Sequence, residues 1–349
     1  MTEQRGRLQV VGFNPEEVET QSDELDPVDG EKETTSRWKK AFVRFRENRS
    51  AMIGIYVVLV MALFALFARP ITVFGIPVQP FSIAPYEPTE FLYRDPNAPC
   101  GSDCIYHPPI LGELWFGTDG DGRDLFSRVI YGGRYSITIG FIVVGLTAGF
   151  GLVYGAVSGY FGGWVDEFMM RIVDVIYAFP GLILALVIVA IFGGGYWQLV
   201  LAFSLFGWAQ YGRLVRGEVL KVKEMEYVTA AKALGAKDRL VIFRHVIPNA
   251  MPPLLVLASL NIGTVVIGVA ALGFLGLGMD PGQPEWGTML DQTRETLTRA
   301  DISEIPWWAT VFPGGAIFLF VMAMNMIGDG VNDALDAQQT GVEGQGGGG

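Results

Sequence analysis

Long apolar blocks without charged side chains are the feature that most constrains this chain. Ala51–Ala68 contains no Asp, Glu, Lys, Arg or His, and further blocks of the same character follow it. A helix needs about 20 mainly apolar residues to cross a bilayer, where all of its backbone N–H and C=O groups must be paired internally. Only 17% of the residues are charged, against about 25% in a typical soluble domain. We therefore predict an all-α membrane protein.

These blocks predict six transmembrane helices. The uncharged run 175–212 is too long for one helix, and the glycines at 193–195 should split it, because glycine favours tight turns. Pro180 should kink the third helix. The predicted spans are 51–68, 135–160, 174–192, 196–212, 252–276 and 308–327. An even number of spans puts both termini on the same side of the membrane.

The distribution of Lys and Arg predicts which side that is. These residues gather in 37–49 and in the loop 213–249, whereas the long segment 69–134 contains few of them. Cytoplasmic loops are enriched in Lys and Arg. Both termini and the loop 213–249 are therefore expected in the cytoplasm, with 69–134 and 277–307 outside.

The remaining segments follow from composition. Residues 1–36 hold many of the acids behind the net charge of −11 and should form a disordered tail. Residues 37–50 should form a basic amphipathic helix on the inner membrane surface, the alternative being an ordinary solvated stretch. No cleavable signal precedes Ala51, so the first span should act as an uncleaved anchor. The rest divides into a five-helix core at 135–328, which includes the loop 213–249, and a cytoplasmic tail at 329–349.

The predicted outer segment contains the only cysteines, Cys100 and Cys104. A local disulfide is plausible on an oxidising face of the membrane. A metal site has less support, since no second cysteine pair exists and only His107 is close in sequence. Asp119, Asp121 and Asp124 fit a calcium loop poorly. They are expected instead to form a turn that leads into an outer amphipathic helix, Arg123–Tyr131.

The predicted spans contain no charged or histidine side chain apart from Asp174 at a boundary. Ion-coupled transporters and membrane-embedded enzymes need such groups within the bilayer. A passive channel and an embedded enzyme remain as alternatives. The chain also lacks a GxxxxGK[ST] phosphate loop, so active transport would require ATP and Mg²⁺ bound by a partner. No catalytic residue, metal, cofactor or nucleic-acid partner is expected for the chain itself.

The loop 213–249 should form two helices. Apolar residues recur every three or four positions from Glu218 to Leu234, and Gly235 can end that helix in a left-handed conformation. A second short helix, Lys237–His245, should stop at Pro248. Small residues beside the turn would let a partner close around the first helix, whereas the alternative is a hairpin that merely lies on the membrane surface.

One part of this loop resembles a known motif. Thr229-Ala230-Ala231, three residues, Gly235, nine residues and then a segment ending in Pro248 resemble the EAA loop of permease subunits of ATP-binding-cassette importers. Thr229 and His245 stand where that motif has Glu and Ile. Segments 116–137, 158–180, 272–290 and 327–336 are similar to signatures of oligopeptide and dipeptide permease C-type subunits. The resemblance extends from Trp38 to Asp336.

The resemblance implies a type I importer permease (MetI-like) fold in the plasma (inner) membrane of a prokaryote. It also implies a second, B-type permease, two ATP-binding subunits and an extracellular substrate-binding protein as partners. The cargo would be di- or oligopeptides, with nickel or another small solute as the alternative.

Two groups of site residues follow from the same resemblance. ATPase docking is assigned to Glu226, Tyr227, Thr229, Ala230, Ala231, Leu234, Gly235, Ala236 and Pro248. The outer mouth, where a binding protein docks, is assigned to Gly117, Thr118, Asp119, Gly122, Arg123 and Asp124.

Overall fold

The structure is a computed structural model that describes residues 37–73, 76–101, 103–280, 282–299 and 305–336. The predicted tail 1–36 and residues 337–349 lie outside this part of the chain. Residues up to Val43 form one unit and residues from Arg44 onward form another, so the fold described below is that of the second. Helix α2 (Arg37–Glu47) corresponds to the predicted basic helix and crosses this boundary.

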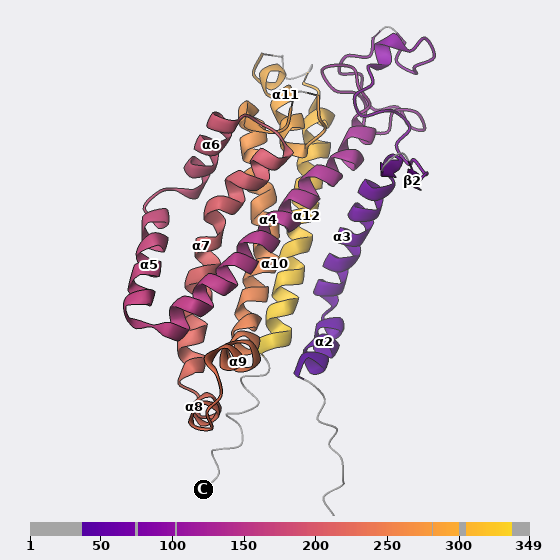
Figure 1. Cartoon of the computed structure of the whole chain (residues 1–349). Helices are drawn as coiled ribbons and strands as arrows, with labels where there is room; N and C mark the ends of the chain where they lie inside the picture. Colours follow the sequence, from indigo (N-terminus) through magenta and orange to yellow (C-terminus); the bar gives the residue numbers. More distant parts are fainter. Residues whose placement is uncertain (1–36, 74–75, 102, 281, 300–304, 337–349) are drawn as a thin grey trace, which may run out of the picture. The chain divides into compact units, whose positions relative to one another are not determined.

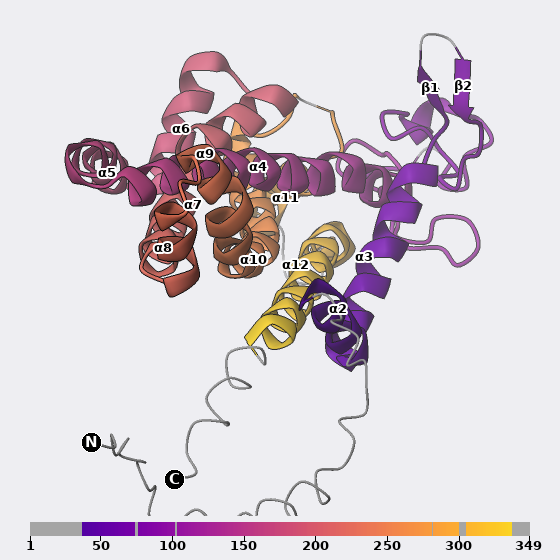
Figure 2. The same ribbon diagram turned by 60° about the horizontal axis from the view of Figure 1, so that its bottom comes forward.

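Five long helices make up the main body. They are α3 (Arg49–Phe67), α4 (Leu125–Phe161), α7 (Tyr196–Lys223), α10 (Ile247–Leu272) and α12 (Trp307–Asp336). Helix α4 packs along α7 and α10, and α12 packs between α10 and α3 (Figure 1). A view turned by 60° also places α12 beside α3 (Figure 2). The predicted mainly helical architecture is confirmed.

The described helices fit four or five membrane crossings. Within the described residues, four helical stretches are long and apolar enough to span a bilayer: Arg49–Phe67, Leu125–Phe161, Asp238–Leu277 and Trp307–Leu335. Helices α5 (Gly163–Tyr177) and α6 (Gly181–Phe192) would form a fifth span, bent by 78°. Helix α7, which would be the sixth, is not among these stretches, so the count of six stays a prediction.

Two predicted boundaries are wrong. Helix α4 already begins at Leu125, so the separate outer helix Arg123–Tyr131 does not exist: residues 125–131 form the first turns of α4, and Asp124 caps it. The third span does not begin at Asp174, because α5 starts at Gly163. At Pro180, where a kink was expected, the helix breaks completely: proline lacks the N–H that would continue the hydrogen-bond ladder.

Glycines let α4 and α7 approach closely. A Cβ added at Gly155 would lie 2.4 Å from the Gly212 carbonyl oxygen, and one at Gly151 would lie 2.8 Å from the Trp208 oxygen. Gly159 continues the row and would bring a Cβ within 2.9 Å of the Arg216 oxygen. Small residues four apart are a common basis for close helix packing in membranes.

The outer segment between α3 and α4 is mostly irregular. It contains a small antiparallel hairpin, β1 (Ile71–Val73) and β2 (Ile76–Gln79), and one turn of 3-10 helix, η1 (Leu92–Arg94). Figure 2 shows the hairpin beyond the end of α3. Cys100 and Cys104 form a disulfide inside a small apolar cluster.

Two helical regions extend beyond the predicted elements. Helix α11 (Trp286–Arg299) lies in the segment that was expected only to be outside the membrane. Helix α12 continues to Asp336, so the predicted tail from 329 begins inside a helix. Asn48, which caps α3, donates from Nδ2 to Asp333 Oδ2 at 2.9 Å and ties the two helix ends together.

Candidate functional site

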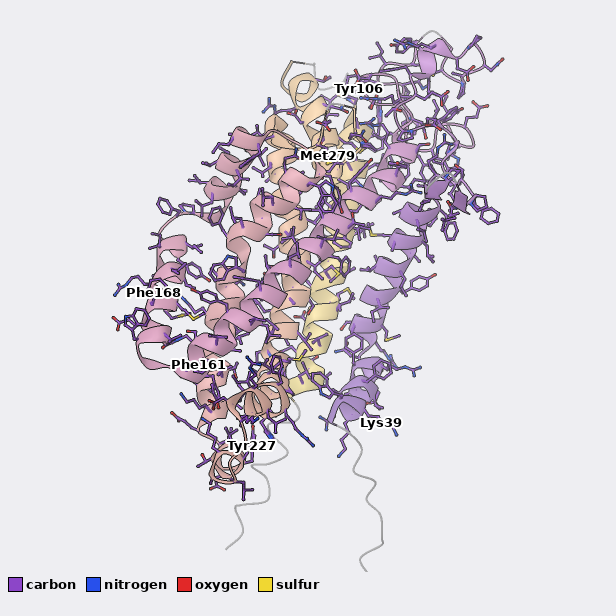
Figure 3. All side chains as sticks on the ribbon, viewed as in Figure 1. Lys39, Tyr106, Phe161, Phe168, Tyr227 and Met279 are labelled. Atoms are coloured by element: carbon purple, nitrogen blue, oxygen red, sulfur yellow. A yellow bond between two sulfur atoms is a disulfide. The ribbon has the colours of Figure 1, made fainter. Side chains whose placement is uncertain are left out.

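A hairpin of short helices connects α7 to α10, and we call residues 224–246 the docking hairpin. It consists of α8 (Glu226–Ala233), α9 (Asp238–Val241) and a π-helical turn, η2 (Ile242–Val246). Figure 1 shows α8 and α9 at the end of the bundle opposite α11, and Figure 3 places Tyr227 there, far from Tyr106.

The predicted helix Glu218–Leu234 is wrong. Helix α7 runs to Lys223, and the extended backbone of Met225 (φ −66°, ψ 141°) precedes the start of α8. The apolar spacing continues through this break because Val219 and Val222 of α7 and Val228 of α8 all pack into one core. Periodicity alone therefore could not reveal the turn.

The predicted stop at Pro248 is also wrong. Helix α9 passes through η2 directly into α10, and Pro248 lies in the first turn of α10. A proline is tolerated inside this continuous helix because it directly follows the π-helical turn η2, and such local adjustments satisfy the backbone groups that a proline leaves unpaired.

Gly235 ends α8 as predicted. Its φ is +80°, and the N–H groups of Gly235 and Ala236 donate to the carbonyls of Lys232 (2.9 Å) and Ala231 (3.1 Å). This pair of bonds is a Schellman motif, which favours glycine at the left-handed position. A Cβ at Gly235 would have no atom within 4 Å, so backbone conformation and not lack of space requires the glycine.

All but one of the predicted docking residues lie in α8 or in the turn that follows it, and most of them are exposed. Glu226, Tyr227, Thr229, Ala230, Leu234 and Gly235 are exposed, and Ala231 and Ala236 are half-buried. Pro248 lies apart from them at the start of α10. Leu234 is 90% exposed, and the exposed Leu240 and Phe243 extend the apolar surface beyond the predicted residues. Exposed apolar patches of this kind mark contact surfaces.

The predicted outer-mouth residues are also brought together, but they are buried. Thr118, Asp119, Arg123 and Asp124 are each at most 3% exposed. Asp119 Oδ2 lies 3.0 Å from Arg123 Nε, and Thr118 pairs with Asp124 in an isolated β-bridge. Gly117 and Gly122 supply the positive φ angles of the turns. These side chains fix the shape of the outer segment, and the docking of a binding protein at this segment stays a prediction.

Arg128 completes this outer network and was not among the predicted site residues. Its Nε lies 3.0 Å from Asp119 Oδ2, and its Nη1 donates to the carbonyls of Pro88 (2.7 Å) and Gly282 (3.1 Å). Its Nη2 also donates to Gln292 of α11 at 3.4 Å. A fully buried arginine thus joins three segments that are distant in sequence. Arg128 lies within the segment 116–137 that resembles a family signature, and this resemblance was the available sequence signal.

Burial also affects the acids and phenols of the outer segment. Desolvation raises the pKa of the Asp124 carboxyl, although hydrogen bonds from Ser127 oppose the effect. Burial likewise raises the pKa of the Tyr106 phenol. Among the residues that the structure describes, no three His, Cys, Asp or Glu side chains gather closely enough to hold a metal ion.

Comparison with known proteins identifies the chain. Residues 151–340 match the family described as the binding-protein-dependent transport system inner membrane component. The chain belongs to this permease family. Residues 36–109 of the permease match a second description, the N-terminal TM domain of oligopeptide transport permease C. The predicted membership of an importer permease family is confirmed, and the protein is a multi-pass inner-membrane permease.

Curated relatives of the permease align over most of their length. It is 38% identical to the dipeptide permease DppC of Alkalihalophilus pseudofirmus over 89% of this chain and 93% of that protein. It is 36% identical to the oligopeptide permease OppC of Bacillus subtilis, over 87% and 91%. It is 38% identical to the glutathione permease GsiD of Shigella dysenteriae, over 86% and 90%. A chain of the MetNI methionine transporter in an inward-facing form has a TM-score of 0.47 at 18% identity, over 58% of this chain and 96% of that one.

Proposed function

We propose that this permease forms half of the pathway for di- or oligopeptides in an ATP-binding-cassette importer. The three relatives described above are named for dipeptides, oligopeptides and glutathione, all of which are peptides. Nickel or another small solute is the alternative cargo. An ATP-independent channel is the alternative mechanism.

The observation that carries the coupling part of the proposal is the exposure of α8. Val228 anchors this helix in the core, while Tyr227, Ala230 and Leu234 remain open at one end of the bundle. The chain has no phosphate loop of its own. A partner ATPase that binds ATP and Mg²⁺ and contacts α8 would supply the energy for transport. ATP would drive transport by favouring one conformation of the complex over another.

The remaining partners follow from membership of the family. A B-type permease would complete the pathway, two ATP-binding subunits would face the cytoplasm, and an extracellular binding protein would deliver the peptide. The predicted six spans, with both termini in the cytoplasm, would put the docking hairpin on the same side as the ATPases.

The coupling role is tested by comparing Gly235→Val with Gly217→Val in the purified complex. Valine at 235 must adopt a positive φ, whereas Gly217 lies inside α7 with open space around its Cβ position. We expect Gly235→Val to lose ATPase co-purification and peptide uptake into proteoliposomes, and Gly217→Val to keep both. Normal uptake by Gly235→Val would refute the docking role. A fully active preparation without any nucleotide-binding chain would refute the importer assignment.

Cargo is tested by competition in the same proteoliposomes. Unlabelled peptides of graded length and a nickel chelate compete with a labelled dipeptide. Dipeptide uptake that peptides alone inhibit supports the proposal, and uptake of the nickel chelate without uptake of the labelled dipeptide favours the alternative cargo.

A further inference from the structure

Tyr160 lies where the docking hairpin meets the bundle. It is the penultimate residue of α4, and its side chain is only 4% exposed. It belongs to the same apolar core as Val222 of α7, Val228 of α8 and Val241 of α9. One aromatic ring therefore occupies the junction of four helices.

Polar contacts join Tyr160 to both arms of the hairpin. Its hydroxyl donates to Asp238 Oδ1 of α9 at 2.5 Å. Lys232 Nζ of α8 lies 4.5 Å from the centre of its ring, and Lys223 Nζ at the end of α7 lies 5.9 Å away. A hydrogen bond to a carboxylate and an ammonium over an aromatic face are both directional attractions.

The polar partners of Tyr160 are not buried. Asp238 and Lys232 are both exposed residues, so water could solvate either charge without Tyr160. Removing the tyrosine hydroxyl would therefore leave no buried, unpaired charge. The contacts hold the hairpin in position against α4 and add little to the stability of the core.

A displacement of Tyr160 would also displace the helices of the bundle, because α4 is closely packed against α7. The neighbouring Gly159 contacts the α7 backbone so closely that an added Cβ would lie 2.9 Å from the Arg216 oxygen. Packed interfaces have discrete arrangements and do not deform continuously. A displacement of α8 and α9 that carries Tyr160 must therefore shift α4 and α7 together.

We propose that Tyr160 is the positioning residue through which the docking hairpin moves α4. The inference rests on the proposed function, in which a partner ATPase binds α8. Tyr160 would keep the hairpin and α4 in a fixed relation, so that closure of the ATPases is converted into rearrangement of the bundle. Without that link, part of the hairpin's movement would be lost before it reaches α4, and fewer ATP molecules hydrolysed would result in transport.

The test uses the whole importer complex in proteoliposomes and measures peptide uptake per ATP hydrolysed. The variants are Tyr160→Phe, which removes only the hydroxyl, and Asp238→Asn, which weakens its acceptor. Tyr154→Phe is the matched control, because that hydroxyl also leaves α4 but donates to the Met169 carbonyl of α5 at 2.7 Å. We expect uptake per ATP to fall at least about threefold in both test variants, the scale of coupling losses along such networks. The control should keep the wild-type ratio.

The double variant Tyr160→Phe/Asp238→Asn should be no worse than the more severe single variant, since both remove the same link. A merely structural role would lower the yield or the melting temperature of the complex but leave uptake per ATP unchanged. An unchanged ratio in Tyr160→Phe, or an equal loss in Tyr154→Phe, would overturn the inference while co-purification of the ATPase still supports the proposed function. If the wild-type permease binds no ATPase, the proposed function itself fails.

Discussion

Arg216 of α7 holds Asp166 of α5 by two hydrogen bonds, from Nε to Oδ1 at 2.5 Å and from Nη2 to Oδ2 at 2.6 Å. Ser158 of α4 donates to the same carboxylate at 2.5 Å. Val173 is the buried residue of α5, so this ion pair is a main attachment of α5 to the bundle.

Asp166→Asn should loosen α5. The change removes one charge of a partly buried, bidentate pair, for which we expect a loss of about 1–3 kcal/mol in the free energy of unfolding. Thermal unfolding of the detergent-solubilised permease measures this loss. The matched control is Glu167→Gln on the same helix, because its ion pair with Arg171 is long (4.0 Å) and its side chain is 75% exposed. That control should change stability by less than about 0.5 kcal/mol, and equal effects would contradict the special role of Asp166.

Asp119→Asn should disrupt the outer network. Asp119 pairs with both buried arginines, and because Arg123 also contacts Asp121, neutralisation of Asp119 leaves mainly Arg128 poorly compensated. Breaking a buried ion pair from one side costs about 3–5 kcal/mol. We expect rapid proteolysis of the outer segment in the variant. Asp121→Asn serves as the control, because that side chain is 53% exposed, and wild-type resistance of Asp119→Asn would disprove the network's importance.

Gly155→Ala should force α4 and α7 apart. The added Cβ would meet the Gly212 oxygen at 2.4 Å and the Arg216 nitrogen at 2.8 Å, and backbone atoms cannot give way as a side chain can. Overpacking of this kind costs about 1–3 kcal/mol or more. Gly149→Ala on the same helix has no atom within 4 Å of the new Cβ and should be neutral or slightly stabilising. Melting temperatures of the two variants make the comparison, and a stable Gly155→Ala would refute the close packing.

Asp124 should make the outer segment more stable at mildly acidic pH. Its raised pKa means that the folded state binds the proton more tightly than the unfolded state does. This group's contribution to stability is therefore lost as pH rises through its folded pKa and regained as pH falls. Asp124→Asn keeps a side-chain oxygen for capping but does not titrate. The melting temperature of wild type minus that of Asp124→Asn should therefore be higher near about pH 4, the ordinary range of an aspartate pKa, than at about pH 7.5. A difference that is constant or falls would contradict the assignment.

Local signals in the sequence explain which features could be predicted. Pro180 and the glycines at 193–195 interrupt helices through their own backbone chemistry, so the breaks on either side of α6 were predictable. The end of α8 at Gly235 was predictable for the same reason, because glycine readily adopts the positive φ that ends a helix. The boundaries of α3 and α12 were found to within a few residues at their starts, because apolar composition changes abruptly there.

The features that were missed depend on contacts between distant residues. Helix α11 is polar and amphipathic, and its buried Trp286 packs against Gly132 and Gly133 of α4, which no local pattern reveals. In the sequence, Arg128 is a single charged residue before an apolar block. Its role depends on the carbonyls of Pro88 and Gly282, which only the folded structure brings to it. The turn before α8 is hidden because helices on both of its sides face one core.

Helix α4 has 37 residues without a break, from Leu125 beside the outer network to Phe161 above the docking hairpin. At about 1.5 Å per residue it is about 55 Å long, well beyond the roughly 30 Å of a bilayer's hydrocarbon core. One continuous helix therefore connects the outer network with the docking hairpin. In the proposed importer, any factor by which nucleotide on the inside changes the affinity for the binding protein outside must equal the factor by which the binding protein changes the affinity for nucleotide, because linkage between two equilibrium binding sites is reciprocal.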